Sequence, residues 1–376
     1  MATAETSAVE VFRKKTPAML EQLSLLVNAE SGSTDLDGIG ACADIIRDLS
    51  ADLTGRAPER VDTAGRIHLV WRPGPDDRPP AVLLLGHFDT VWPHGTVARW
   101  PFAFDDERAT GPGAFDMKAG IVQMFHALAH TGSPENVAYV LTSDEELGSQ
   151  TSRLLIEQIA EGATATLVLE PSADGALKVA RKGTSMYEIA VEGRAAHAGL
   201  EPENGANATV ELAHQILAVT QVARPDIGTT VTPTVASGGT TTNTVPANAV
   251  VHVDVRAETQ DEQDRVDKEI RSLRPHVDGT RLIVSGGPNR PPFSKDASAS
   301  LFDEAQEAAA TLGLEPLRGE AVGGGSDGNF TAGLGVPTLD GLGAVGGKAH
   351  AEGEWVHIPS MAERAALLAE LIRRLT

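Results

Sequence analysis

The chain has 376 residues, of which 41% are hydrophobic, and its 52 acidic residues outnumber the 31 Lys and Arg residues, giving a formal net charge of −21. Two domains are expected, because a single hydrophobic core stops growing at about 250–300 residues. The negative charge disfavours nucleic acid and anionic membranes as binding partners. The excess of acidic residues could serve solubility, adaptation to salt or a functional acidic face.

The first part of the chain starts with a helical pattern and continues with alternating strands and helices. Apolar residues recur at helical spacing over residues 9–27 and predict a helix there. The following segments are predicted in this order: strand 66–72, strand 81–85, helix 118–130, strand 137–141, helix 151–159 and strand 165–169. Such an alternation predicts a mixed or mostly parallel sheet with helices on its faces.

The pattern changes in the middle of the chain. The predicted segments there are strand 185–191, helix 206–222, strand 229–236, strand 249–255, helix 262–273 and strand 281–285. This βαββαβ order is the ferredoxin-like arrangement. A helix at 299–312, a glycine-rich turn at 323–325 and a closing helix at 361–375 then return the chain to the first domain. We therefore predict a first domain built from residues 1–181 and 292–376, with an inserted domain at 182–291.

The sequence also indicates a cellular location. The single cysteine, Cys42, cannot form an internal disulfide, and its apolar surroundings at 39–49 predict a buried, inert thiol. Charged residues interrupt the first 16 residues, which therefore lack the apolar core of a signal peptide. No segment approaches the ~20 apolar residues of a membrane span. A soluble, cytoplasmic protein is expected.

Five short segments are rich in possible metal ligands. They cover residues 86–90, 113–118, 143–148, 169–171 and 349–352. Together they can supply two His and three carboxylates to a pair of zinc ions and leave one carboxylate as a base. Each segment alone is weak evidence, because an isolated His-x-Asp is more often a satisfied pair and an acidic pair is more often a solvated helix start.

The combination is more specific than its parts. His87, Glu145 and Glu170 each follow an apolar run that predicts a strand, and the carboxyl ends of parallel strands converge on one crevice. Asp116 is the candidate bridge, because the two oxygens of a carboxylate can each meet one metal. The adjacent Glu145 and Glu146 suit a division into base and ligand. Asp89 could hold the second ring nitrogen of His87.

The chain resembles the M20 family of metallopeptidases and, within it, is most similar to the glutamate carboxypeptidases. The motifs that carry this resemblance are Gly-His-Phe-Asp-Thr-Val at 86–91, Gly-Ala-Phe-Asp-Met-Lys-Ala-Gly at 113–120, Asp-Glu-Glu-Leu-Gly at 144–148, His-Ala-Gly at 197–199, Asn-Gly-Ala-Asn-Ala at 204–208 and Gly-Gly-Gly-Ser-Asp at 323–327. It implies an α/β fold, with a zinc-peptidase catalytic domain whose central mixed sheet is flanked by helices, and a ferredoxin-like lid and dimerisation domain.

The resemblance also implies the roles of individual residues. One zinc would be held by His87 and Glu170 and the other by Glu146 and His350, with Asp116 bridging them. Glu145 matches the general base of the family, and the peptide bond after Asp116 is cis in family members. Two Zn²⁺ per subunit are thus expected, and Co²⁺ or Mn²⁺ can replace Zn²⁺ at carboxylate-rich sites.

For substrate recognition, the resemblance implies residues of the lid. His197 would stabilise an oxyanion and enter the site of the partner subunit, although a purely structural histidine is the alternative. The candidates for binding a substrate carboxylate are Lys182, Asn243, Arg256 and Arg290. Arginine suits this role because its planar fork pairs with both carboxylate oxygens. Lys182 and Arg256 could equally be surface ion-pair residues.

The glycine-rich turn, which contains Gly324, has three interpretations. It lacks the lysine and the spacing of a P-loop, which argues against phosphate binding. Backbone donors could close over a substrate carboxylate or carbonyl. The plain alternative is the start of a helix capped by Ser326 or Asp327.

We therefore expect a di-zinc hydrolase that cleaves an amide bond next to a free carboxylate and releases a C-terminal amino acid of glutamate type from a peptide or N-acyl conjugate. A deacylase of N-acyl amino acids or dipeptides is the alternative within the same chemistry. A non-catalytic metal-binding scaffold is the third possibility, against which Glu145 speaks because a binder needs no base. Apolar strands at 229–236 and 249–255 would be hazardous as free edges, which favours a homodimer formed through the lid.

Overall fold

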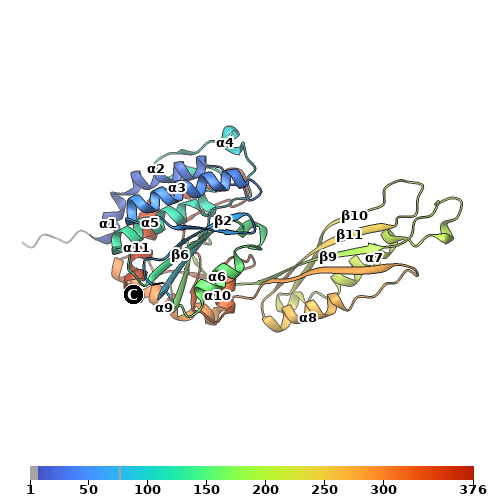
Figure 1. The fold of residues 1–376 in the computed structure, drawn as a ribbon. Coiled ribbons are helices and arrows are strands. Elements are labelled where there is room, and N and C mark those ends of the chain that lie inside the picture. Colours follow the sequence, from blue (N-terminus) through green and yellow to red (C-terminus); the bar gives the residue numbers. More distant parts are fainter. Residues whose placement is uncertain (1–6, 76–77) are drawn as a thin grey trace, which may run out of the picture. The chain divides into compact units, whose positions relative to one another are not determined.

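The computed structural model describes residues 7–75 and 78–376, which form two compact units (Figure 1). The first unit contains the chain up to Ala180 together with Lys295–Val322 and Ser326–Thr376, and the second contains Arg181–Ser294 with Gly323–Gly325. Residues 1–6, part of the segment considered above for a signal peptide, lie outside the described residues. Among the described helices, each is too short or too polar to cross a lipid bilayer.

A six-stranded mixed sheet forms the centre of the first unit. In spatial order its strands are β1 (Glu59–Thr63), β2 (Arg66–Trp71), β6 (Val137–Thr142), β3 (Val82–His87), β7 (Ala165–Val168) and β14 (Thr338–Leu339). The last four of these run parallel, whereas β1 and β2 pair antiparallel. Both β3 and β6 are buried at every position, which explains why their sequences are continuous apolar runs without alternation.

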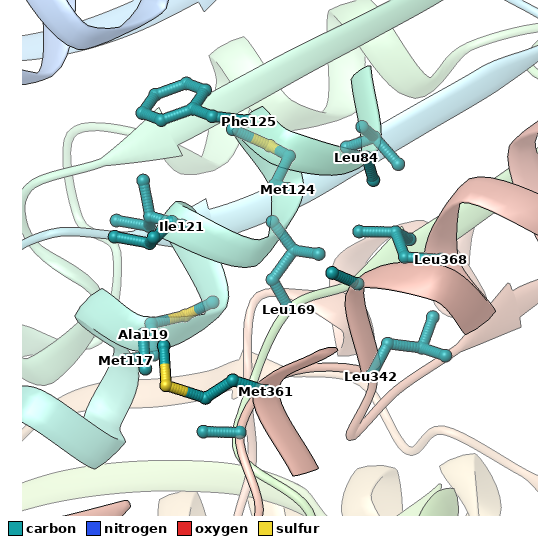
Figure 2. Packing of buried hydrophobic residues seen from close by; sticks show 14 of the residues in the cluster. Leu84, Met117, Ala119, Ile121, Met124, Phe125, Leu169, Leu342, Met361 and Leu368 are labelled. Carbon is teal, nitrogen blue, oxygen red and sulfur yellow. The ribbon is translucent and has the colours of Figure 1, made fainter. Parts of the chain in front are cut away.

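Helices cover both faces of this sheet (Figure 1). The larger layer consists of α1 (Ala8–Arg13), α2 (Thr16–Asn28), α3 (Leu36–Thr54), α5 (Ala119–Thr131), α9 (Lys295–Leu312) and α11 (Ile358–Leu375), and the smaller layer of α6 (Arg153–Ala160) and α10 (Gly328–Gly333). Leu84 packs into the larger core, whereas Leu83 and Leu85 pack into the smaller one. Figure 2 shows part of the larger core, with Met117 and Met361 in it. The predicted α/β fold is confirmed.

The helix predicted over residues 9–27 is in fact two helices, and this prediction was wrong in its continuity. The first helix, α1, ends at Arg13, and α2 starts at Thr16 with Pro17 in its first turn. Proline has no backbone N–H and clashes with the carbonyl four residues earlier, so it is tolerated at a helix start but not in a helix interior. The chain therefore breaks just before Pro17.

Short elements complete the first unit. They are the helix α4 (Thr96–Arg99), the single turns η1 (Ala114–Lys118) and η2 (Glu145–Leu147), a sheet of β15 (Gly346–Gly347), β16 (Trp355–His357), β5 (Arg108–Thr110) and β4 (Ala103–Phe104), and the pair β13 (Gly319–Val322) and β8 (Leu177–Arg181). Through the pairing of β16 with β5, the segment after His350 lies beside the segment before Asp116.

The second unit is a four-stranded antiparallel sheet with two helices. Along the chain its main elements are β9 (Gly183–Glu192), α7 (Ala208–Thr220), β10 (Thr230–Gly238), β11 (Asn248–Ala257), α8 (Gln260–Arg271) and β12 (Arg281–Arg290), with single turns η3 (Pro202–Asn204) and η4 (Pro225–Ile227). The sheet order β10-β11-β9-β12 and the βαββαβ chain order confirm the ferredoxin-like prediction. Asn207 and Thr259 cap the starts of α7 and α8 through their side-chain oxygens. This unit has a hydrophobic core of its own.

The cysteine in α3 leads to a first prediction. The Cys42 side chain has 0% exposure, and burial raises the pKa of its thiol although Lys118 and Ser31 oppose the shift. Because the thiolate is the reactive form, the native protein should scarcely react with a chromogenic disulfide reagent at neutral pH. The unfolded chain should release one equivalent of chromophore. Rapid stoichiometric reaction of the native protein would contradict this description of Cys42.

Candidate metal centre

The candidate ligands lie where three parallel neighbours of the central sheet end. His87 is the last residue of β3, Glu145 and Glu146 follow β6, and Glu170 follows β7. These strands are adjacent in the order β6-β3-β7, so their carboxyl ends meet at one edge of the sheet. Asp116 in η1 and His350 in the loop before β16 join them from elsewhere in the same unit.

Five side chains form two groups that share one carboxylate. The first group is His87, Asp116 and Glu170, and the second is Asp116, Glu146 and His350; in each, one ligand atom per residue lies within 4.8 Å of the others. His87 Nε2 is 3.2 Å from Asp116 Oδ1 and 3.4 Å from Glu170 Oε1. His350 Nε2 is 3.0 Å from Glu146 Oε1 and 3.4 Å from Asp116 Oδ2. The two oxygens of Asp116 thus face different imidazoles.

The site is closed on one side and open on the other. His87 has 1% exposure and Glu170 7%, whereas the His350 side chain has 52%. Lys178 Nζ lies 3.6 Å from Glu170 Oε2 and supplies a fixed positive charge beside that carboxylate. His350 is thus the exposed member of the second ligand group.

The histidines and carboxylates of the site shift one another's pKa values. Burial alone would lower the pKa of His87, but hydrogen bonds to Asp116, Asp89 and Glu170 raise it well above its usual value. Hydrogen bonds to Asp116 and then Glu146 raise the pKa of His350 to about 10. Burial would raise the pKa of Asp116, yet the two histidines hold it far below its usual range. A cluster of this kind stabilises positive charge at its centre.

The Asp116 turn has a constrained backbone. The Asp116–Met117 peptide bond is cis, as the family resemblance implies. Met117 is fully buried (Figure 2), and its sulfur accepts a hydrogen bond from the backbone N–H of His87 at 3.2 Å. Gly113 has φ +72°, and a Cβ there would lie 2.4 Å from a Thr90 methyl carbon, so only glycine fits without displacement.

Asp89 lies beside the second ring nitrogen of His87, as expected from the sequence. The ring Nδ1 of His87 lies 3.0 Å from the backbone carbonyl oxygen of Asp89 and 3.4 Å from its carboxylate. That buried carboxylate accepts hydrogen bonds from the Ser33 hydroxyl at 2.8 Å and from the backbone N–H groups of Glu145 and Glu146 at 3.2 and 3.3 Å. Asp89 therefore orients the acidic pair as well as His87. Glu145 lies near enough to contribute to the raised pKa of His87.

One residue important to this site was missed from the sequence. Glu354, with 0% exposure, accepts hydrogen bonds from the backbone N–H groups of Gly113, Phe115 and Asp116. Sequence reasoning stopped at the nearby Glu352, which is exposed. A sequence signal was available, because Glu354 directly precedes the strand Trp355–His357, whose central Val356 is apolar and buried. Side chains two residues apart in an extended segment point to the same side, so Glu354 is expected to be buried with Val356.

The predicted substrate-binding residues belong to the second unit. Within it, His197 and Asn243 are neighbours, since the Ala198 N–H donates to the Asn243 carbonyl at 2.9 Å. The Nδ1 atom of His197 accepts from the N–H groups of Gly199 and Leu200, both at 3.1 Å, which leaves the proton of a neutral ring on Nε2. His197 is exposed and is therefore suited to donate a hydrogen bond.

The cationic candidates in that unit have varied surroundings. Arg256 forms a bidentate pair with Asp254 at 2.8 and 2.7 Å, and Lys182 Nζ lies 3.5 Å from Glu258. These contacts are the ion pairs expected if both residues have a structural role. Arg290 is buried at the end of β12. In the glycine-rich turn, the carbonyl oxygens of Gly324 and Gly325 accept hydrogen bonds from Arg181.

The glycine-rich turn leads into α10. Ser326 Oγ accepts from the Gly328 N–H at 3.1 Å and donates to Asp340. Asp327 instead accepts from Thr142 and Ser149. The Ser326 side chain therefore accepts a hydrogen bond at the start of α10, whereas the Asp327 side chain makes no capping hydrogen bond.

Comparison with known proteins identifies the family. The model of peptidase family M20/M25/M40 matches residues 83–374. The chain belongs to this family. Carboxypeptidase G2 of Pseudomonas sp. (strain RS-16) is 31% identical to this M20 peptidase over 381 residues, covering 95% of the chain and 89% of the relative.

Solved structures share the fold of this M20 peptidase. The M20 family metallo-carboxypeptidase Sso-CP2 of Sulfolobus solfataricus aligns with a TM-score of 0.75 at 16% identity, covering 96% of this chain and 99% of that one. YXEP of Bacillus subtilis, a dinuclear metal binding peptidase from the M20 family, aligns with a TM-score of 0.64 at 14% identity, covering 97% and 99%. Membership makes the chain a metallopeptidase, and its two ligand groups match the dinuclear site that the family implies.

Proposed function

We propose that this M20 peptidase is a di-zinc carboxypeptidase that hydrolyses an amide bond next to a free carboxylate and releases a C-terminal amino acid of glutamate type. The observation that carries the proposal is the pair of His and carboxylate groups that share Asp116, with Glu145 beside them. The similarity to carboxypeptidase G2 over most of both chains supports it.

The donor set fits two divalent ions of borderline softness. Imidazole and carboxylate are the ligands that zinc takes in catalytic sites, and Co²⁺ or Mn²⁺ accept them too. His87 and Glu170 would hold one ion, Glu146 and His350 the other, and Asp116 would bridge them. When bound, such ions polarise a carbonyl group and lower the pKa of a water.

Glu145 has the role of general base in this proposal. Its carboxylate takes a proton from the attacking water and returns it to the nitrogen of the departing amine, so that one residue serves both halves of the hydrolysis. Asp89 holds the backbone of Glu145 and thereby fixes where that carboxylate can lie. His197, as a donor through Nε2, would stabilise the oxyanion.

Recognition of the substrate is proposed for the second unit. Arg290 and Asn243 are the preferred partners of the substrate carboxylate, with backbone donors at Gly324 in support. Lys182 and Arg256 are weaker candidates, because their positions match the pattern of the glutamate carboxypeptidases less closely. The unit is also proposed to form the contact of a homodimer, in which His197 serves the site of the partner subunit.

A deacylase of N-acyl amino acids is the second candidate. Succinyl-diaminopimelate desuccinylase 2 of Shewanella loihica is 31% identical over 206 residues, although these cover only 48% of this chain. The metal-binding scaffold remains the least favoured possibility, because Glu145 would have no task in it.

A substrate panel separates these possibilities. The zinc-loaded protein should release glutamate from N-acyl-glutamates and from peptides ending in glutamate, and a chelator should abolish the release. The matched control is the same substrate with its α-carboxylate amidated, which should resist cleavage. Faster cleavage of N-succinyl diamino acids would favour the deacylase, and no release from any substrate would favour the scaffold.

The base assignment is tested by Glu145→Gln. The amide cannot take a proton from water, so kcat should fall by at least about 10²–10⁴-fold while both metal ions remain bound. Metal content measured by atomic emission after dialysis is the deciding readout. Loss of zinc together with activity would make Glu145 a ligand and contradict the division of roles.

The role of His197 across a dimer is tested by mixing inactive variants. Subunits carrying His197→Ala and subunits carrying Glu145→Gln should regain activity when they exchange, because some mixed sites then combine an intact base with an intact histidine. Exchange is monitored by mass spectrometry of tagged subunits. Demonstrated exchange without activity would mean that His197 serves its own subunit or is structural.

A further inference from the structure

Glu354 lies where three segments of the candidate metal centre meet. Its Oε1 accepts hydrogen bonds from the N–H groups of Phe115 and Asp116 at 2.8 and 2.9 Å. Its Oε2 accepts from the N–H of Gly113 at 3.1 Å and from the indole of Trp92 at 3.0 Å. One fully buried carboxylate thus satisfies four donors.

The three backbone donors all belong to the turn that presents Asp116. A charged acceptor in a dry environment holds N–H groups more firmly than a neutral one, and bonds shared between two oxygens restrict rotation of the turn. The N–H of Asp116 itself is among them, so its Cα and the direction of its side chain are constrained. That direction puts the Asp116 oxygens 3.2 Å from His87 Nε2 and 3.4 Å from His350 Nε2.

Glu354 also joins this turn to the two segments that carry the histidines. It follows His350 by four residues in the same loop, whose turn is closed by the hydrogen bond from the Glu354 N–H to the Ala351 carbonyl at 3.1 Å. Trp92 lies in the segment that continues from His87 and Asp89. A displacement of Glu354 would therefore change the spacing of His87, Asp116 and His350 together.

We propose that Glu354 is a positioning residue of the metal centre. It belongs to neither ligand group, and it acts by holding Asp116 between the two imidazoles. This inference rests on the proposed function, since it takes the two ligand groups to hold divalent ions. Residues that orient metal ligands in this way commonly affect affinity as much as activity.

The test uses the full-length chain and the substitution Glu354→Gln. Glutamine has the same shape, but one of its two terminal atoms is a donor. In either orientation this NH₂ group faces two N–H donors that then lose their acceptor. Glu352→Gln is the matched control, because it makes the same change of charge at an exposed position two residues away.

Two quantities are measured on each protein: zinc affinity, by competition with a chromophoric chelator, and the melting temperature of the metal-free chain. Glu354→Gln should bind zinc about 10–100-fold more weakly, and excess zinc should restore most of the turnover. Glu352→Gln should bind zinc as the parental protein does. Unchanged affinity of folded Glu354→Gln would overturn the proposal whatever happens to its melting temperature, because Glu354 would then be purely structural.

A second variant covers the case in which Glu354→Gln does not fold. Glu354→Asp keeps the buried charge, but it is one methylene shorter and cannot reach Trp92 and the turn together. It should also bind zinc more weakly, and parental affinity in this variant would overturn the proposal. A parental protein that binds no divalent ion would overturn the proposed function as well, which distinguishes the two failures.

Discussion

The candidate site depends on the gathering of acidic side chains at the carboxyl ends of the strands of a buried sheet. Asp116, Glu146 and Glu170 lie there within reach of only two imidazoles, and carboxylates this close and this poorly hydrated require positive charge between them. The neighbouring carboxylates accordingly raise the pKa values of His87 and His350, and divalent ions bound between the ligands would supply the same positive charge. The chemistry of the site therefore follows from this electrostatic requirement.

Much of this could be read from the sequence, because the signals are local. His87 and Glu145 follow continuous apolar runs, and in a parallel sheet such runs end at one edge. Glu354 could not be read in this way, because its partners at Gly113 and Trp92 are far away in the chain and only the pairing of β16 with β5 brings them together. Pro17 was a local signal for a new helix start, but the helical spacing of apolar residues over 9–27 favoured one continuous helix.

Buried carboxylates accept hydrogen bonds from backbone N–H groups in both units. In the first unit, Asp89 and Glu354 accept such hydrogen bonds. In the second unit, Glu211, with 0% exposure, accepts from the N–H groups of His276 and Val277. In the second, Arg256 pairs with its strand neighbour Asp254 and His197 caps its own turn through Nδ1. The partner of an exposed charged residue depends on which residues lie near it in the fold, and spacing in the sequence does not reveal these. The roles proposed for residues of the second unit therefore rest on the family resemblance.

The order of the ligands along the chain has a consequence for synthesis. His87, Asp116, Glu146 and Glu170 precede the second unit, whereas His350, the edge strand β14 and the covering helix α11 all follow it. A ribosome therefore releases the acidic half of the centre long before its last imidazole and Glu354 emerge. The second unit has its own core, whereas the first unit combines segments that precede and follow it in the chain. The second ligand group is therefore complete only once His350 has been synthesised.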